Sequence, residues 1–320
     1  MINISLGSIS IPIQEVLSSL LGSSDNPTWD IIISDFRLPK AITAILVGSG
    51  LGISGLLMQT LFRNPLAGPF VLGISSGASL GVAVIILGSG VFGGILAGVL
   101  GSKWSIVIAS SIGSFFVLMA VLTISNKVRD TMAILIIGLM LGSITASVVS
   151  VLSYFSSAEQ LQQYIFWGFG SLSNLSWNDI LIFIILYTIG LFLCIFSIKG
   201  LNSLLLGENY ALSLGLDLKK SRFIIIIATS LLAGTITAFA GPIAFIGLAI
   251  PHLTRLVFRT TNHKILVPAV ALFGAVLMLI CDSIAQVPYS NYTLPINAIT
   301  ALIGVPVVIW LLVRQRKMMF

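Results

Sequence analysis

Residues 178–199 read NDILIFIILYTIGLFLCIFSIK, and no charged side chain interrupts the run between Asp179 and Lys199. An α-helix rises 1.5 Å per residue, so roughly 20 apolar residues are needed to cross the hydrocarbon core of a bilayer. This segment has that length. It therefore predicts a transmembrane helix.

The rest of the chain repeats this pattern. Long apolar stretches fall at about 41–61, 70–88, 104–124, 131–154, 178–199, 222–240, 243–258, 265–286 and 297–314. We therefore expect nine spans, of which 243–258 is short and predicts a tilted or partly re-entrant helix. The connections between them are too short for a separate folded domain.

Composition gives the same fold class. Of 320 residues, 57% are hydrophobic and 8% are charged, whereas soluble proteins carry roughly 25% charged residues. So few charges exclude a soluble enzyme, a nucleic-acid binder and a disordered protein as readings of the whole chain. We predict an all-α polytopic membrane protein with one transmembrane domain over residues 1–320.

The basic residues, which outnumber the acidic ones by six, predict the orientation. With the C-terminus inside, 13 of them face the cytoplasm and three face outward. The inner set is Arg63, Lys127, Arg129, Lys199, Lys219, Lys220, Arg222, Arg255, Arg259, Lys264, Arg314, Arg316 and Lys317; the outer set is Arg37, Lys40 and Lys103. Because cytoplasmic loops are enriched in Lys and Arg, this asymmetry supports both the span count and an external N-terminus.

Residues 1–40 differ from the spans and are expected to form an extracytoplasmic surface segment. Near-alternation of isoleucine and leucine over 2–13 predicts extended chain, and apolar residues at helical spacing over 16–21 predict a short amphipathic helix. Trp29, Ile32, Ile33 and Phe36 are expected to share a helix face that suits the membrane interface.

Glycine is patterned within the spans. Gly48 and Gly52 are four residues apart, as are Gly73, Gly77 and Gly81, and also Gly138 and Gly142. Small residues at this spacing let helix backbones approach closely in a bilayer, which predicts a compact bundle.

Groups that carry chemistry are scarce. The sequence has no Gly-x4-Gly-Lys-Ser/Thr phosphate loop and no Gly-Lys pair. His252 and His263 lack a Cys, Asp or Glu at ligand spacing, and Cys194 and Cys281 lie in apolar runs. We therefore predict no catalytic residue, no metal site and no cofactor.

Asp282 is the candidate carboxylate at membrane depth, near the outer end of its span. It is interpreted as reaching the interface or bonding a neighbouring helix, with an ion-coupled secondary transporter as the alternative.

Two segments expected in the cytoplasm contain more sequence features than a simple connection between spans requires. Residues 58–69 read MQTLFRNPLAGP, where proline and glycine end one helix and start the next. Residues 200–222 contain a half-apolar helix that stops at Gly215, which fits either a membrane-surface element or a docking element for a partner.

Several motifs together resemble the FecCD/BtuC-type permease family, in the family's order from about residue 4 to 315. They are RLPK at 37–40, LVG at 46–48, SG at 54–55, MQ at 58–59, RNPLA at 63–67, LGISSGA at 72–78, LLGE at 205–208 with Ala211 and LG at 214–215, FIGLAIPH at 245–252 with Arg255, LP at 294–295 and TALIGVP at 300–306.

The resemblance implies the membrane subunit of a type II ABC importer for an iron–siderophore complex, haem or cobalamin, in a bacterial or archaeal cytoplasmic (inner) membrane. Two copies, or this chain and a close paralogue, would form the pore in the lipid bilayer. Two ATPase subunits would dock inside and a substrate-binding protein outside. No nucleic acid is implied, and the chain itself would not be an enzyme.

The resemblance also implies site residues. Arg37 and Lys40 would dock the binding protein, with anchoring to lipid headgroups as the alternative. The cytoplasmic coupling helices would lie within 200–222 and include Leu206, Gly207, Glu208, Ala211, Leu214 and Gly215.

Within the coupling segment, Leu206 and Ala211 are expected to face a groove of the ATPase. As an alternative to a role in coupling, Glu208 would stabilise the N-terminus of its helix through the helix dipole. Lys219, Lys220 and Arg222 are interpreted as anchors at the lipid surface.

The translocation pathway is assigned from the resemblance together with composition. It would be lined by Gly142, Ser143, Ala146, Ser147 and Ser150, which are small and weakly polar. Close helix packing by the same residues is the alternative.

Three features depart from the family pattern. Gln286 stands where the family has Arg, and Asn297 stands where it has Gly. The family has ten spans and a cytoplasmic N-terminus, so a hydrophobic helix is missing before residue 4. We expect that the first residue of the protein was assigned too far along the sequence. The alternatives are that the sequence was shortened or that this family member lacks the helix.

Overall fold

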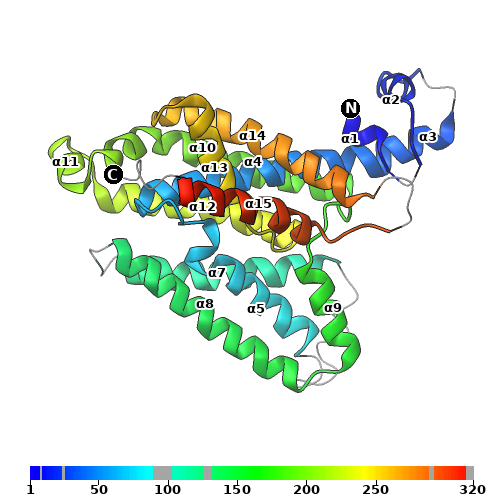
Figure 1. Cartoon of the computed structure of the whole chain (residues 1–320). Coiled ribbons are helices and arrows are strands. Elements are labelled where there is room, and N and C mark those ends of the chain that lie inside the picture. The colour runs from blue at the N-terminus through cyan, green and yellow to red at the C-terminus, as the bar shows by residue number, and fades with distance from the viewer. Residues whose placement is uncertain are drawn as a thin grey trace.

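The computed structural model describes residues 1–7, 9–23, 26–88, 103–125, 128, 131–287 and 292–314, and within these ranges it contains helices and no strand. Helices α4, α10, α12, α13, α14 and α15 form one layer, and α5, α7, α8 and α9 pack below it (Figure 1). The predicted all-α class is confirmed.

The helices follow the predicted apolar stretches. They are α1 (Ile2–Ser5), α2 (Ile13–Leu20), α3 (Pro27–Ile31), the π-helix η1 (Ile32–Arg37), α4 (Leu38–Leu61), the 3-10 helix η2 (Pro69–Leu72), α5 (Ile74–Ile86), α7 (Lys103–Ser125), α8 (Thr131–Tyr154), α9 (Ala158–Gly168), α10 (Trp177–Leu205), α11 (Glu208–Ser213), α12 (Leu218–Ala240), α13 (Ile246–Phe258), α14 (His263–Ala285) and α15 (Ile296–Arg314).

All nine predicted stretches are helical, but they are not nine equal spans. In the described residues, six helices are long and apolar enough to cross a membrane, and α5, α13 and α15 contribute shorter apolar segments. The shortening has a local cause: α5 begins after Gly73 and α13 after Phe245, both in the left-handed region. Stretch 243–258 is helical as α13 and is short, as expected; its tilted or re-entrant placement in the membrane stays a prediction.

Helix α4 is the centre of the bundle. It packs against α10, α12, α13 and α14, and every residue from Leu46 to Leu61 is buried. A Cβ built on Gly48 would overlap the backbone of Gly274, and one on Gly55 would overlap the carbonyl oxygen of Gly247. The predicted role of glycine in close helix packing is confirmed at these contacts.

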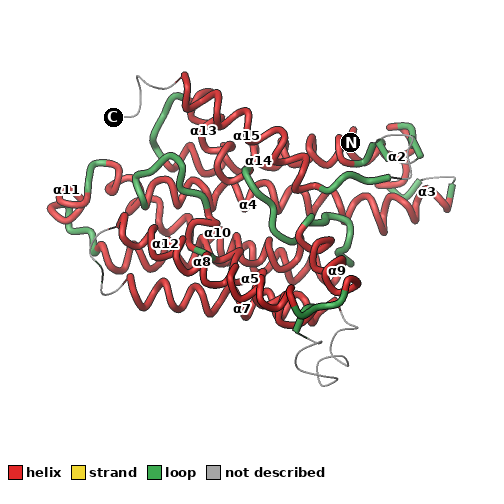
Figure 2. The backbone as a smooth tube through the Cα atoms, turned by 60° about the horizontal axis from the view of Figure 1, so that its bottom comes forward, coloured by secondary structure: helices red, strands yellow, loops and turns green. Residues whose placement is uncertain are grey.

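The two ends of the bundle carry different elements. Helix α11 lies at one end of the bundle, and α1, α2 and α3 lie at the other (Figures 1 and 2). This separation agrees with the orientation predicted from charge, in which the first 40 residues are external and 200–222 are cytoplasmic. Of the basic residues behind that prediction, Lys127, Arg129, Arg316 and Lys317 lie outside the described residues.

The N-terminal segment corrects one expectation. Residues 2–5 form the helical turn α1 rather than extended chain, because tertiary hydrogen bonds described below override the alternating pattern. The amphipathic helix expected near 16–21 is confirmed as α2, whose Val16 is buried. The face of Trp29 and Ile32 continues through α3 into η1 and packs on α1 and α2.

Candidate functional site

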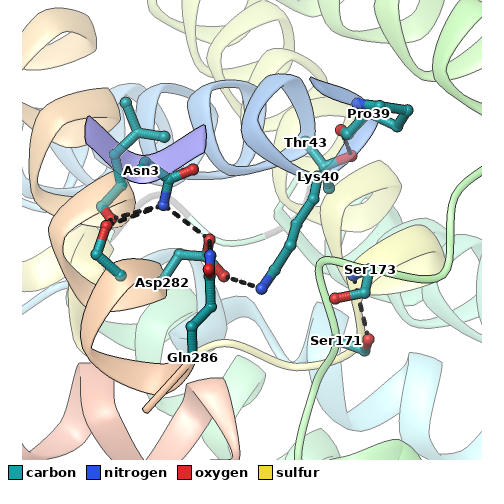
Figure 3. Close-up of polar contacts among 10 residues, drawn as sticks. Asn3, Pro39, Lys40, Thr43, Ser171, Ser173, Asp282 and Gln286 are labelled. Carbon is teal, nitrogen blue, oxygen red and sulfur yellow. Dashed lines mark hydrogen bonds and ion pairs between the residues drawn. The ribbon is translucent and has the colours of Figure 1, made fainter. Parts of the chain in front are cut away.

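Three side chains converge on the buried carboxylate of Asp282, at the outer end of α14 (Figure 3). Lys40 Nζ lies 3.0 Å from Oδ1. The amide groups of Asn3 and Gln286 donate to Oδ2 at 2.9 and 2.7 Å. The Asp282 side chain is 3% exposed, so this carboxylate is buried and is bonded by three side chains. The interpretation that it bonds a neighbouring helix is confirmed.

Arg37, one turn before Lys40, holds the N-terminal segment. Its guanidinium donates to the carbonyl oxygens of Ile4 at 2.6 Å and Ser5 at 2.9 Å, and also to that of Ile9. The last carbonyls of a helix have no partner within it, so a cation there satisfies them. Together with Asn3, Arg37 explains why α1 is helical.

The predicted docking residues therefore have internal partners. Lys40 and Asp282 also border a cavity of about 350 Å³, which is completed by the loops around Ser171 and Pro295. Lys40 is 16% exposed. A role for Arg37 and Lys40 in docking a binding protein stays a prediction.

The two departures from the family pattern have structural roles. Gln286 occupies the position of the family's arginine and bonds Asp282. Asn297 accepts a hydrogen bond from the backbone N–H of Ala244 at 3.1 Å and donates to the carbonyl of Gly168 at 3.4 Å. It thereby ties the start of α15 to the loop before α13 and to the end of α9.

Helix α8 presents the predicted pathway residues on one open surface. Ser143, Ala146, Ser147 and Ser150 are exposed in the isolated chain, and Gly142 is half-buried against Ser76. The three serine hydroxyls donate to carbonyls one turn earlier on the same helix, at 3.0–3.1 Å. This satisfies each donor and leaves a weakly polar surface. Whether it lines a pathway stays a prediction.

The coupling segment folds as a short helix between two left-handed glycines. Gly207 has φ 105° and Gly215 has φ 80°, and α11 lies between them. Leu206 and Leu214 are 61% and 58% exposed. This gives the end of the bundle that carries α11 a compact apolar projection.

Two expectations within this segment are wrong. Ala211 is fully buried, because α11 packs on α10 and α12 through this face, so it does not face a partner groove. Arg222 is not at the lipid surface: its Nη2 lies 2.6 Å from Glu208 Oε1, and its side chain is 10% exposed. Tyr210 and Leu212, which sequence analysis missed, are exposed instead.

The pairing of Glu208 with Arg222 had a weak signal in the sequence. The two opposite charges stand 14 residues apart on either side of a helix break at Gly215. A chain reversal at that glycine brings them together. The same pair fixes the orientation of α11 on α12.

Comparison with known proteins gives a consistent result. The FecCD transport family matches residues 1–314. The vitamin B12 import system permease protein BtuC of Salmonella paratyphi A is 33% identical over 97% of this chain and 95% of its own length. The protein of the same name from Salmonella typhi matches equally well.

Two solved structures share the fold. One, an inward-facing conformation assigned to a metal-chelate type ABC transporter, has a TM-score of 0.85 and 30% identity over 98% of this chain and 94% of that one. The other, PsaBC from Streptococcus pneumoniae in complex with Fab, has a TM-score of 0.61 and 16% identity over 93% and 95%. The chain therefore belongs to the FecCD transport family and is a multi-pass membrane permease of the BtuC type.

Proposed function

We propose that this chain is the membrane subunit of an ABC importer in the inner membrane, and that it moves a metal chelate into the cytoplasm. The observation that carries the proposal is similarity over nearly the whole chain to BtuC and to a metal-chelate type transporter. The cargo class is an iron–siderophore complex, haem or a cobalamin. ATP is hydrolysed by a separate subunit.

The internal bonding of Asp282 argues against an ion-coupled transporter. Such a mechanism needs a carboxylate or histidine that exchanges an ion at membrane depth. Asp282 is paired with Lys40 and bonded by two amides. Its charge is therefore compensated within the fold.

Partner surfaces are available at both ends and along one side. The exposed leucines and tyrosine of the α11 region fit a cytoplasmic ATPase, and the cavity beside Lys40 fits a docked binding protein. The open surface of α8 suits a second copy of the chain or a close paralogue, with the pathway between them.

Uptake by proteoliposomes tests the proposal. The chain is reconstituted with a partner ATPase subunit and a binding protein, and accumulation of labelled cyanocobalamin, haem or a ferric siderophore is followed. We expect uptake that requires internal ATP and the loaded binding protein. Uptake driven by a proton or sodium gradient without ATP would contradict it. Titration of the binding protein with the same ligands identifies the cargo.

A further inference from the structure

A cationic cavity of about 470 Å³ opens at the cytoplasmic end of the bundle, beside the start of α11. It lies between the end of α4, the loop that follows, and the end of α13. Arg63, Arg255 and Arg259 line it together with Thr60 and Thr261, and none of the described residues that line it is acidic.

Arg255 is the deepest of the three arginines and has no carboxylate partner in the described chain. Its Nη1 donates to the neutral Oε1 of Gln59 at 2.8 Å. The Gln59 amide in turn donates to the carbonyl of Leu248 at 3.2 Å, which fixes the pair. A half-buried guanidinium bonded only to a neutral amide is a site where an anion is favoured.

The nearby acids in the described residues are already engaged. Glu208 pairs with Arg222, and Asp217 accepts from the backbone N–H of Lys220 as the cap of α12. The nearby histidines also have partners: His252 bonds the carbonyl of Pro65, and His263 lies between Thr60 and Asn202. Among the described residues, no carboxylate forms an ion pair with Arg63, Arg255 or Arg259.

Backbone strain points to the same place. Four non-glycine residues have positive φ in the described chain, and two of them, Arg63 at 46° and Arg259 at 44°, border this cavity. Both directly follow or cap a helix end, where glycine or asparagine is favoured because the left-handed region is strained for other residues. Strain at two arginines on one cavity is an observation from which a function can be inferred.

We propose that this cavity binds the phosphate group of an anionic phospholipid from the cytoplasmic leaflet. Arginine suits phosphate because its planar fork donates two hydrogen bonds at once. Basic pockets between helices on the cytoplasmic side are places where lipid headgroups bind. Exposed Leu66, Val257 and Phe258 adjoin the lining residues in the chain and provide apolar surface for acyl chains.

The cavity lies next to the coupling segment, so a bound lipid would be close to it. A Cβ built on Gly207 would lie 3.8 Å from Nη1 of Arg63, so the cavity borders the start of α11. A phosphate held by Arg63 would therefore stabilise the junction between the α4 loop and α11.

The test uses the full chain, purified in detergent and exchanged into dioleoyl phosphatidylglycerol or dioleoyl phosphatidylcholine. Native mass spectrometry counts retained lipid, and thermal unfolding reports stabilisation. For the wild type, we expect retention of phosphatidylglycerol and a higher unfolding temperature than with phosphatidylcholine. Millimolar inorganic phosphate alone should not reproduce the shift.

The informative variant is Arg63→Asn combined with Arg259→Asn. Asparagine tolerates positive φ, so the fold should be retained while two guanidinium groups are removed. The matched control is Lys219→Gln combined with Lys220→Gln, which removes two exposed positive charges at the same end. We expect the arginine variant to bind phosphatidylglycerol about tenfold or more weakly, since hydrogen bonds to charged groups contribute on this scale. The control should bind normally.

Three outcomes would overturn the proposal. Equal loss in the lysine control would show nonspecific attraction to an anionic surface. Full stabilisation by inorganic phosphate would assign the cavity to a free anion. Unchanged lipid retention in the arginine variant would show that the cavity does not bind the phospholipid.

Discussion

Asp282 and Lys40 lie in a setting where one charge cannot be removed without affecting the other. Lys40→Met leaves the 3%-exposed carboxylate of Asp282 with only the amides of Asn3 and Gln286. Removing one partner of a buried pair costs about 3–5 kcal/mol. We expect the free energy of unfolding to fall by an amount in the lower part of this range, because the two amides remain. Thermal and denaturant unfolding in detergent measures it.

The double variant Lys40→Met with Asp282→Asn completes the thermodynamic cycle. It removes both charges and keeps an amide that can bond Asn3. We expect it to be more stable than Lys40→Met alone. If the decreases in the free energy of unfolding of the two single variants add up to that of the double variant, the two side chains do not interact in the folded protein.

At the scale of elements, the contact between α4 and α13 depends on Gly55. A Cβ at this position would overlap the backbone of Gly247, so Gly55→Ala must separate the two helices. Overpacking of this kind costs about 1–3 kcal/mol or more. Gly168→Ala is the control, because nothing lies within 4 Å of its Cβ position. We expect a lower unfolding temperature for the first variant only.

Helix α11 supports a prediction about coupling. Tyr210 on α11 and Leu206 just before it are exposed, whereas Ala211 on α11 is buried. Leu206→Asp should therefore weaken association with the ATPase and abolish its stimulation by loaded binding protein, without lowering the unfolding temperature of the isolated chain. Ala211→Arg should instead destabilise the chain itself. ATP hydrolysis in nanodiscs and thermal unfolding separate the two effects.

Lys219→Gln with Lys220→Gln is the control for α11, because both lysines are exposed and unpaired with Glu208. Stimulation should be close to normal in this variant. Normal stimulation in Leu206→Asp as well would mean that the coupling surface lies elsewhere.

At the scale of the whole molecule, the exposed surface of α8 can either line the translocation pathway or face lipid, and mutation of this surface tests which. Ser143→Trp with Ser147→Trp adds bulk to this surface, where the isolated chain has room. If it lines the pathway between two copies, uptake should fall at least about tenfold while dimers still form. Ile185→Trp on α10, which is also exposed, should leave uptake unchanged. Uptake assays measure transport, and cross-linking measures dimer formation. Normal uptake in the serine variant would place the pathway elsewhere.

The amino-acid sequence by itself determined the all-α class and the nine helical stretches, and it predicts the orientation. Each of these depends on local hydrophobicity, helix length or the distribution of basic residues, which are properties of the chain read in order. The glycine spacing likewise predicted close packing. It did not show that Gly48 meets Gly274 or that Gly55 meets Gly247, because partners on other helices depend on how the bundle is assembled.

Only the tertiary structure decided which polar side chains have partners. The bonds of Lys40 and Asn3 with Asp282 span more than 240 residues of sequence, and no local pattern encodes such a pairing. The same reason explains the errors. Residues 2–5 became helical because Arg37 and Asp282 bind them, and Ala211 and Arg222 turned inward because α11 packs on α10 and α12. Local sequence sets where helices form, whereas packing free energy sets which faces they bury.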